Sequence, residues 1–326
     1  MQDLPPSAQV VFMGTPEFAV PSLKRLAEDH DVLAVYCQPP RRQGRGMKER
    51  PSPVHQAALD LGIEVRCPLK FDDEAVAELQ SLAPEFLVVV AYGMILPQAV
   101  LDIPSKAPIN GHASILPRWR GAAPIHRAIE HGDAETGVTA MVMEAGLDTG
   151  PMLTIEKTPI EDTDTTGSLH DRLAEITANV LAETLLSFDE LSPSPQDQDD
   201  VTWAEKITPQ EAEIDFTQPY EVIDRRMRAF APFPGSWLSL GDGAPALRLK
   251  IREIAPAPLQ GISNKTFGQV MGKGEHGGPV VACKDGGVEL VRVQPAGKPV
   301  MMGRDFLNGY EMPSHITRVN QSGESN

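Results

Sequence analysis

The chain has 326 residues, of which 41% are apolar and 23% charged, a size and composition typical of a globular protein with two domains. No apolar run approaches the roughly 20 residues of a membrane-spanning helix, and the first residues lack the basic-then-apolar pattern of a signal peptide. Three widely separated cysteines indicate neither a disulfide framework nor a zinc site. We therefore expect a cytoplasmic protein without a metal.

The net charge of −16 is unevenly distributed along the chain. Residues 203–326 hold 14 cationic and 14 acidic side chains, so the whole acidic excess lies in residues 1–202. An acidic chain has no general affinity for nucleic acid, because such affinity requires neutralisation of phosphates. The segment 41–50 (RRQGRGMKER) is an exception, with five cations and one acid. This basic loop is a candidate for local phosphate binding.

Strand and helix patterns alternate along the first 112 residues. Apolar runs predict strands at 10–13, 32–37, 63–66, 86–91 and 107–112, and helical spacing predicts helices at 21–28, 54–61 and 72–82. The uninterrupted apolar run at 86–91 is typical of a central parallel strand. The pattern predicts an open, mostly parallel, Rossmann-like α/β sheet, in which ligands bind beyond the carboxyl ends of the strands. Residues 92–96 and 110–117 both follow such ends.

The second half of the chain changes from mixed to mainly β-type patterns. Helices are predicted at 124–131, 166–186 and 220–230, and strands at 137–144 and 152–158, with a turn at 145–150 that contains Asp148. The polar, proline-containing stretch 193–200 (PSPQDQDD) is typical of a linker. Short strands at 237–240, 247–254, 268–271, 280–282 and 288–293 predict a small β-barrel.

Asn110 and His112 form the first candidate site. Two residues apart on an extended segment, they project from the same side, so an amide donor and an imidazole base meet one substrate. Several enzyme classes are disfavoured by missing motifs. The first strand leads into Gly14-Thr15-Pro16 without the dinucleotide fingerprint or a phosphate-binding loop, and no G-x-S-x-G elbow of a serine hydrolase occurs.

Two motifs carry a resemblance to a known family. NGHASILP at 110–117, followed by GLDTG at 146–150, resembles the signature of the folate-dependent formyltransferases. PRWRGAAPI at 117–125 and GDAETGV at 132–138 are similar to the branch of that family that acts on methionyl-tRNA, and QPAGK at 294–298 extends the similarity into the second half. The resemblance covers nearly the whole chain.

The resemblance implies an activity, a co-substrate and roles for three residues. The branch that acts on methionyl-tRNA transfers the formyl group of 10-formyltetrahydrofolate to the α-amino group of methionine on initiator tRNA. By analogy, Asn110 donates to the oxyanion, His112 stabilises that charge and assists proton transfer, and Asp148 orients the imidazole or orders a relaying water. Sequence alone does not decide between these routes for the proton.

The resemblance also implies the binding segments for both substrates. The folate site is expected to be formed by Ser114, Ile115, Leu116 and Pro117 and by Tyr92, Gly93, Met94, Ile95 and Leu96. The basic loop matches the segment that grips the tRNA acceptor arm, with Arg45 as the matched residue and Arg41, Arg42 and Lys48 as phosphate contacts by charge alone. In the second domain, Lys250, Arg252 and Lys298 are candidate tRNA contacts.

The expected domains are a formyltransferase catalytic domain at 1–190, a linker at 191–207 and an OB-like, tRNA-contacting domain at 208–326, in a monomer. Three alternatives remain. The chain could formylate an amino sugar or nucleotide with the same three residues, act as a hydrolase or dehydrogenase module on folate, or bind tRNA with a vestigial site. The basic loop and the run from Arg118 to Gly121 favour tRNA as the substrate over an amino sugar.

Overall fold

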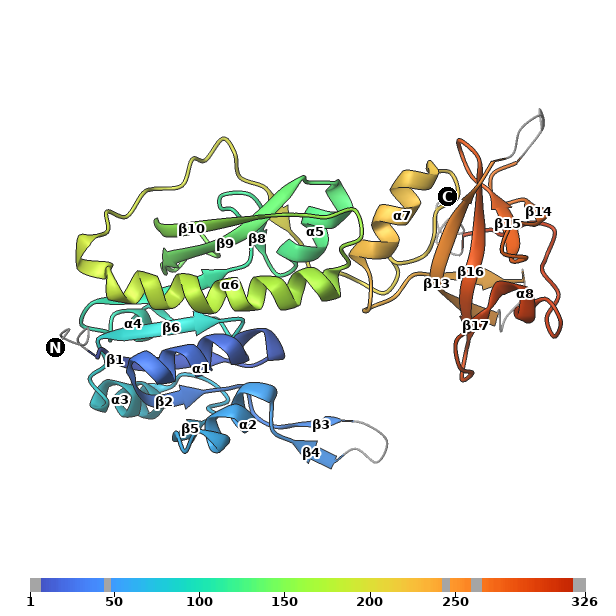
Figure 1. The fold of residues 1–326 in the computed structure, drawn as a ribbon. Coiled ribbons are helices and arrows are strands. Elements are labelled where there is room, and N and C mark those ends of the chain that lie inside the picture. Colours follow the sequence, from blue (N-terminus) through green and yellow to red (C-terminus); the bar gives the residue numbers. More distant parts are fainter. Residues whose placement is uncertain (1–6, 44–47, 242–246, 259–265, 319–326) are drawn as a thin grey trace, which may run out of the picture. The chain divides into compact units, whose positions relative to one another are not determined.

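The computed structural model describes residues 7–43, 48–241, 247–258 and 266–318 (Figure 1). The chain divides into two compact units. Unit 1 comprises Met1–Ile125, Ala134–Glu161 and Ser168–Glu205, and unit 2 comprises His126–Asp133, Asp162–Gly167 and Lys206–Asn326. Unit 2 therefore contains most of the helix α5 (Pro124–His131).

Unit 1 is built on a seven-stranded sheet in the order β10-β9-β7-β6-β1-β2-β5. Its strands are β1 Gln9–Gly14, β2 Asp31–Tyr36, β5 Val65–Arg66, β6 Phe86–Val90, β7 Ala107–His112, β9 Glu135–Val142 and β10 Met152–Pro159. The first five of these are mutually parallel, whereas β9 and β10 pair antiparallel at one edge. The expected open, mostly parallel α/β sheet is confirmed.

Helices cover both faces of this sheet. They are α1 Val20–Asp29, α2 Pro53–Asp60, α3 Asp73–Ser81, α4 Gln98–Leu101 and α6 Thr166–Leu186, with short 3-10 helices η1 Glu17–Ala19 and η2 Phe188–Glu190. In β1, Val11 and Met13 pack into a cluster with Leu79 of α3 and Val100 of α4. Because side chains alternate along a strand, the intervening residues of β1 face the opposite layer. Figure 1 shows α1 and α6 running side by side in that layer.

Four short strands of unit 1 were not predicted. The backbone of the basic loop forms a hairpin, in which β3 Arg41–Gln43 pairs antiparallel with β4 Lys48–Arg50. Arg45 lies outside the described residues, as do the side chains of Arg41, Arg42 and Lys48. The other two strands, β8 Arg120–Gly121 and β11 Trp203–Ala204, form a parallel pair. A two-residue strand has no period, so sequence patterns cannot detect it.

Unit 2 contains an antiparallel sheet in the order β12-β13-β16-β15-β14, with β17 paired to β16. The strands are β12 Trp237–Leu240, β13 Leu247–Ala257, β14 Val270–Lys273, β15 Pro279–Ala282, β16 Gly287–Pro295 and β17 Met301–Met302. One core cluster joins this sheet to Ile223 of α7 (Tyr220–Ala229) and Phe306 of α8 (Gly303–Phe306). The prediction was a separate C-terminal domain with a small, OB-like β-barrel. The separate β-domain is confirmed as an antiparallel sheet, and the strand pairings of the described residues do not close it into a barrel. Of its candidate tRNA contacts, Arg252 is held by Gln294 and Lys298 is exposed.

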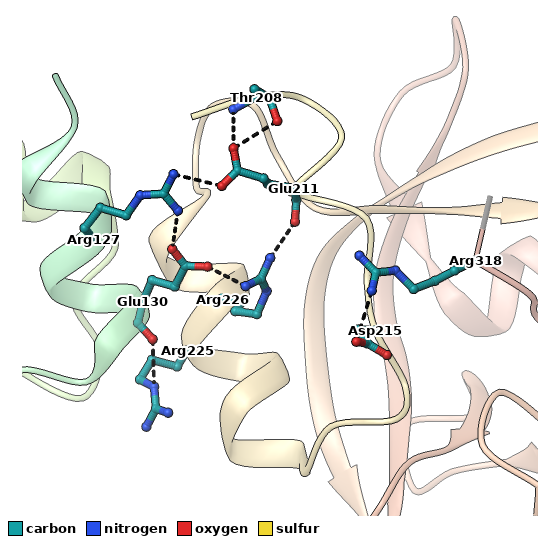
Figure 2. Close-up of polar contacts among 8 residues, drawn as sticks. All are labelled: Arg127, Glu130, Thr208, Glu211, Asp215, Arg225, Arg226 and Arg318. Carbon is teal, nitrogen blue, oxygen red and sulfur yellow. Dashed lines mark hydrogen bonds and ion pairs between the residues drawn. The ribbon is translucent and has the colours of Figure 1, made fainter. Parts of the chain in front are cut away.

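A network of ion pairs organises the first part of unit 2 (Figure 2). Arg127, on α5 (Pro124–His131), contacts Glu130 at 2.7 Å and Glu211 at 2.8 Å. Arg226 of α7 pairs with the same Glu130 and donates to the backbone carbonyl of Glu211 at 2.7 Å. Burial disfavours the charged form of Glu211, but hydrogen bonds from Thr208 and Arg127 outweigh burial and lower its pKa. The network fastens α5 to α7.

No helix in the described parts of the chain is long and apolar enough to cross a membrane. The three cysteines are free thiols, and Cys37 and Cys283 are buried. Burial raises the pKa of Cys37 to about 12, so this thiol stays protonated and unreactive at neutral pH.

Candidate active site

β7 presents Asn110 and His112 on one face of the sheet. The residue between them, Gly111, faces α6 so closely that an added Cβ would lie 2.7 Å from a methyl carbon of Thr177. Alternation along the strand then directs Asn110 and His112 away from α6. Both side chains are buried, with exposed fractions of 9% and 7%. Glycine at this position lets α6 pack tightly against β7 behind the site.

Asp148 reaches the same place from the turn between β9 and β10. Its Oδ1 accepts from the amide of Asn110 at 3.4 Å, and its Oδ2 lies 3.7 Å from Nδ1 of His112. The backbone N–H of Gly121 also donates to Oδ2, at 2.9 Å. Asp148 has a positive φ of 52°, a conformation that aspartate tolerates better than most residues. The structure thus brings the three candidate catalytic residues together.

The hydrogen bonds of His112 determine which ring nitrogen carries a proton. Nε2 lies 2.9 Å from the carbonyl oxygen of Trp119. Because a carbonyl only accepts, Nε2 is the donor, and neutral His112 therefore has its lone pair on Nδ1. Nδ1 faces Asp148. It is the nitrogen that can take up a proton, and the neighbouring carboxylate would stabilise the imidazolium that forms.

The segment 114–117 forms a tight turn after β7. Ser114 is fully buried; its hydroxyl donates to the carbonyl of Arg118 at 2.6 Å, and its carbonyl accepts from Thr139 at 2.7 Å. The N–H of Leu116 donates to the same Thr139 hydroxyl, and the Leu116 side chain is 2% exposed. Ile115 and Pro117 are half-buried. Ile115 and Pro117 are thus more exposed than Ser114 and Leu116.

The segment 92–96 follows the neighbouring strand β6. Tyr92 is 2% exposed and packs on Phe71, with ring centroids 6.4 Å apart, whereas Gly93 and Ile95 are exposed. Thr15, after β1, donates to the Tyr92 carbonyl at 2.8 Å, and Gln38, after β2, donates to the Gly93 carbonyl at 2.6 Å. The ends of three parallel strands are thus tied together. The residues that this edge leaves open to solvent include Gly93 and Ile95, which is 92% exposed.

Two residues near the site were missed by sequence reasoning. Gln196 is 7% exposed, and its carboxamide donates to the backbone carbonyls of Asp148 at 2.9 Å and Gly150 at 2.8 Å. Thr202 accepts from the N–H of Trp119 at 2.9 Å. Both lie in or beside a stretch whose composition is typical of a linker. A glutamine among serines, prolines and acids carries no pattern that could have indicated its contacts.

The arrangement supplies an amide donor, an imidazole and a carboxylate in a largely buried site at the end of a central strand. These groups suit a reaction that develops negative charge on oxygen and moves protons between nitrogens. Within the described ranges, no three His, Cys, Asp or Glu side chains gather in a way that could hold a metal ion.

Comparison with protein families gives two matches that together span most of the chain. Residues 8–185 match the model of the family described as "Formyl transferase", and residues 206–311 match that of "Formyl transferase, C-terminal domain". The first match alone covers more than half of the 326 residues. It includes all three members of the cluster formed by Asn110, His112 and Asp148.

Individual relatives agree with this assignment. A methionyl-tRNA formyltransferase from Ruegeria pomeroyi is 49% identical over 94% of this chain and 98% of its own length. Among solved structures, an N-formyltransferase from Helicobacter canadensis, in complex with folinic acid and dTDP-3-aminofucose, has a TM-score of 0.62 at 18% identity and covers 90% of this chain and 100% of its own. A methionyl-tRNA formyltransferase from Clostridium thermocellum has a TM-score of 0.54 at 17% identity, covering 76% and 93%. The two structures support the fold, and the family matches with the close relative lead to one conclusion: the chain belongs to the formyl transferase family, among the methionyl-tRNA formyltransferases.

Proposed function

We propose that this protein transfers the formyl group of 10-formyltetrahydrofolate to the α-amino group of methionine on initiator tRNA. The observation that carries the proposal is the cluster of the buried Asn110 and His112 with the half-buried Asp148, which lies 3.4 Å from the first and 3.7 Å from the second. Its setting is a chain 49% identical to a methionyl-tRNA formyltransferase over almost its full length. The product is formylmethionyl-tRNA for translation initiation.

In the proposed mechanism, the neutral amine attacks the formyl carbon, and a carbon–nitrogen bond forms as the carbonyl electrons move onto oxygen. The amide of Asn110 donates a hydrogen bond to this oxyanion, a contribution of the kind worth about 10²–10³ in rate. His112 Nδ1, which holds the lone pair, accepts a proton from the new ammonium, and Asp148 stabilises the imidazolium. Collapse of the intermediate re-forms the carbonyl and breaks the bond to N10 of the folate. N10 takes up the proton held by the imidazolium, directly or through a water, and His112 is neutral again.

We propose that the folate lies along two neighbouring strand ends. Residues 92–96 and 114–117 follow β6 and β7, which are adjacent and parallel, so the two segments share one edge of the sheet. The half-buried Ile115 and Pro117 would contact the ligand, the exposed backbone around Gly93 would supply hydrogen bonds, and Ser114 and Leu116 would shape the turn. Such a site holds the donor beside Asn110.

For the tRNA we propose the hairpin of β3 and β4 as the first contact. Arg41, Arg42, Arg45 and Lys48 would bind the acceptor arm, and the antiparallel domain at 208–326 would add contacts to the rest of the tRNA. The catalytic domain at 1–190 and the segment 191–207 complete the proposed organisation. Because one copy of unit 1 contains all three catalytic residues, a monomer suffices, and translation initiation places the reaction in the cytoplasm.

A formylation assay with three acceptors tests the proposal. Purified protein and 10-formyltetrahydrofolate are incubated with methionyl initiator tRNA, methionyl elongator tRNA, or a nucleotide-linked amino sugar of the kind bound by the Helicobacter canadensis neighbour. We expect rapid formylation of the initiator only. Preferential formylation of the amino sugar would refute the proposed substrate. Arg45→Ala should raise KM for tRNA and leave folate binding unchanged, and an unchanged KM would remove the hairpin from the proposal.

A further inference from the structure

Residues 194–204, which follow α6, lie against the segments that form the candidate active site. Ser194 forms a two-way backbone bridge with Met152, at the start of β10, with both distances 2.8 Å. At the other end, β11 pairs with β8. We call residues 194–204 the strap. Every contact of the strap described here is made within unit 1.

Both polar atoms of the Gln196 side chain form hydrogen bonds with segments at the site. Nε2 donates to two carbonyls of the Asp148 turn, those of Asp148 and Gly150, at 2.9 and 2.8 Å. Oε1 accepts from Nε of Arg120 at 2.9 Å. Arg120 is 3% exposed, and its Nη2 has no hydrogen-bond partner among the described residues. Gln196 therefore gives a buried guanidinium one hydrogen-bond acceptor and also holds the turn.

These contacts connect the turn that contains Asp148 to the segment that donates to its carboxylate. Gly121, which directly follows Arg120, donates its N–H to Oδ2 of Asp148. The Gln196 side chain is thus hydrogen-bonded both to the backbone of Asp148 and to Arg120, the residue before Gly121. Because Asp148 has a positive φ, its turn needs outside contacts to hold one conformation. Gln196 supplies two of them.

We propose that Gln196 is a positioning residue for formyl transfer: it holds the Asp148 turn so that the carboxylate faces Nδ1 of His112. This inference rests on the proposed catalytic role of Asp148. Gln196 acts through Asp148 and does not touch the reacting atoms. A displacement of about 1 Å at a reacting group can cost about 10²-fold in rate. Loss of the Gln196 hydrogen bonds therefore lowers the rate of the chemical step and leaves substrate binding unchanged.

Two variants separate the functions of the side chain. Gln196→Glu keeps the acceptor for Arg120 and the length of the side chain but loses both donors to the turn. Gln196→Met keeps the unbranched volume without charge and loses every hydrogen bond. We expect each to lower kcat by about 10- to 100-fold, with KM for folate and tRNA changed less than about threefold. Gln80→Glu, the same exchange at an exposed position on α3, is the matched control with wild-type kcat.

A double-mutant cycle with Asp148→Asn decides between positioning and general support of the fold. If Gln196 acts through Asp148, the Gln196 variants cause no further loss of kcat in the Asp148→Asn background. Equal losses in both backgrounds, or wild-type kcat in both Gln196 variants, would overturn the inference alone. An Asp148→Asn enzyme with wild-type kcat would overturn the proposed role of Asp148 and the inference with it. Retention of the wild-type Tm in Gln196→Glu shows that the loss of rate is not unfolding.

Discussion

Asp148 and His112 face each other through Oδ2 and Nδ1 at 3.7 Å, although Asp148 comes from a turn and His112 from a central strand. The other ring nitrogen of His112 is bonded to the Trp119 carbonyl, so the nitrogen that faces Asp148 is the basic one. The pair therefore combines a proton acceptor with the charge that stabilises its protonated form.

Asn110→Ala should lower kcat by about 10²–10³ and leave KM for both substrates nearly unchanged. The reason is that its amide would stabilise an oxyanion that exists only after the amine has attacked. Steady-state formylation kinetics provide the measurement. Asn110→Asp should be at least as slow, because a carboxylate repels the oxyanion. Loss of substrate affinity with unchanged kcat would assign Asn110 to ground-state binding instead.

Thr202→Val should reduce kcat by about tenfold, because the N–H of Trp119 loses its hydroxyl acceptor while the residue keeps its shape. The neighbouring carbonyl of Trp119 orients His112, so the effect should appear in the chemical step. Thr163→Val, at an exposed position, is the control and should behave as wild type. A Thr202→Val enzyme with normal kcat would show that Trp119 does not depend on this hydrogen bond.

Gly150→Ala should lower the free energy of unfolding by about 1–3 kcal/mol. An added Cβ would lie 1.8 Å from the carbonyl oxygen of Val142, so the turn that contains Asp148 must shift. Urea unfolding measures the change, and kcat should fall in the same variant. Gly309→Ala meets no atom within 4 Å and is the matched control. Equal stability of the two variants would contradict the packing described for the turn.

We expect acid to reduce the stability that the Glu211 carboxylate gives to unit 2. Its pKa in the folded chain is lowered from the ordinary 4.5, so the stability it contributes is fully present above that value. This stability is lost as the pH falls through the lowered pKa and the ion pair with Arg127 breaks. Urea unfolding of wild type and Glu211→Gln from pH 7 to pH 3 should show a difference in stability that shrinks toward acid. A difference independent of pH would contradict the ionic origin of the contribution.

The sheet of unit 1 could be predicted because its signals are local. The apolar run that became β6 (Phe86–Val90) and the helical spacing of α6 (Thr166–Leu186) each stand out within one window of sequence. The pairing of Asn110 with His112 follows from strand geometry, whereas Asp148 joined them only through family resemblance. The role of Gln196 could not be predicted. The two residues whose carbonyls it contacts lie 46 and 48 positions away, and its own neighbourhood has the composition of a linker. Contacts of this kind are set by tertiary packing, which no local pattern records.

The central claim is that His112 and Asp148 act as one unit in formyl transfer to methionyl initiator tRNA. The most direct measurement is the single-turnover rate of transfer from 10-formyltetrahydrofolate, with saturating substrates, for wild type, His112→Ala, Asp148→Asn and the double variant. Each single variant should transfer the formyl group at least about 10²-fold more slowly than wild type, and the double variant should be no slower than His112→Ala. A double variant slowed by the product of the two single effects, or a His112→Ala enzyme with the wild-type rate, would contradict the claim.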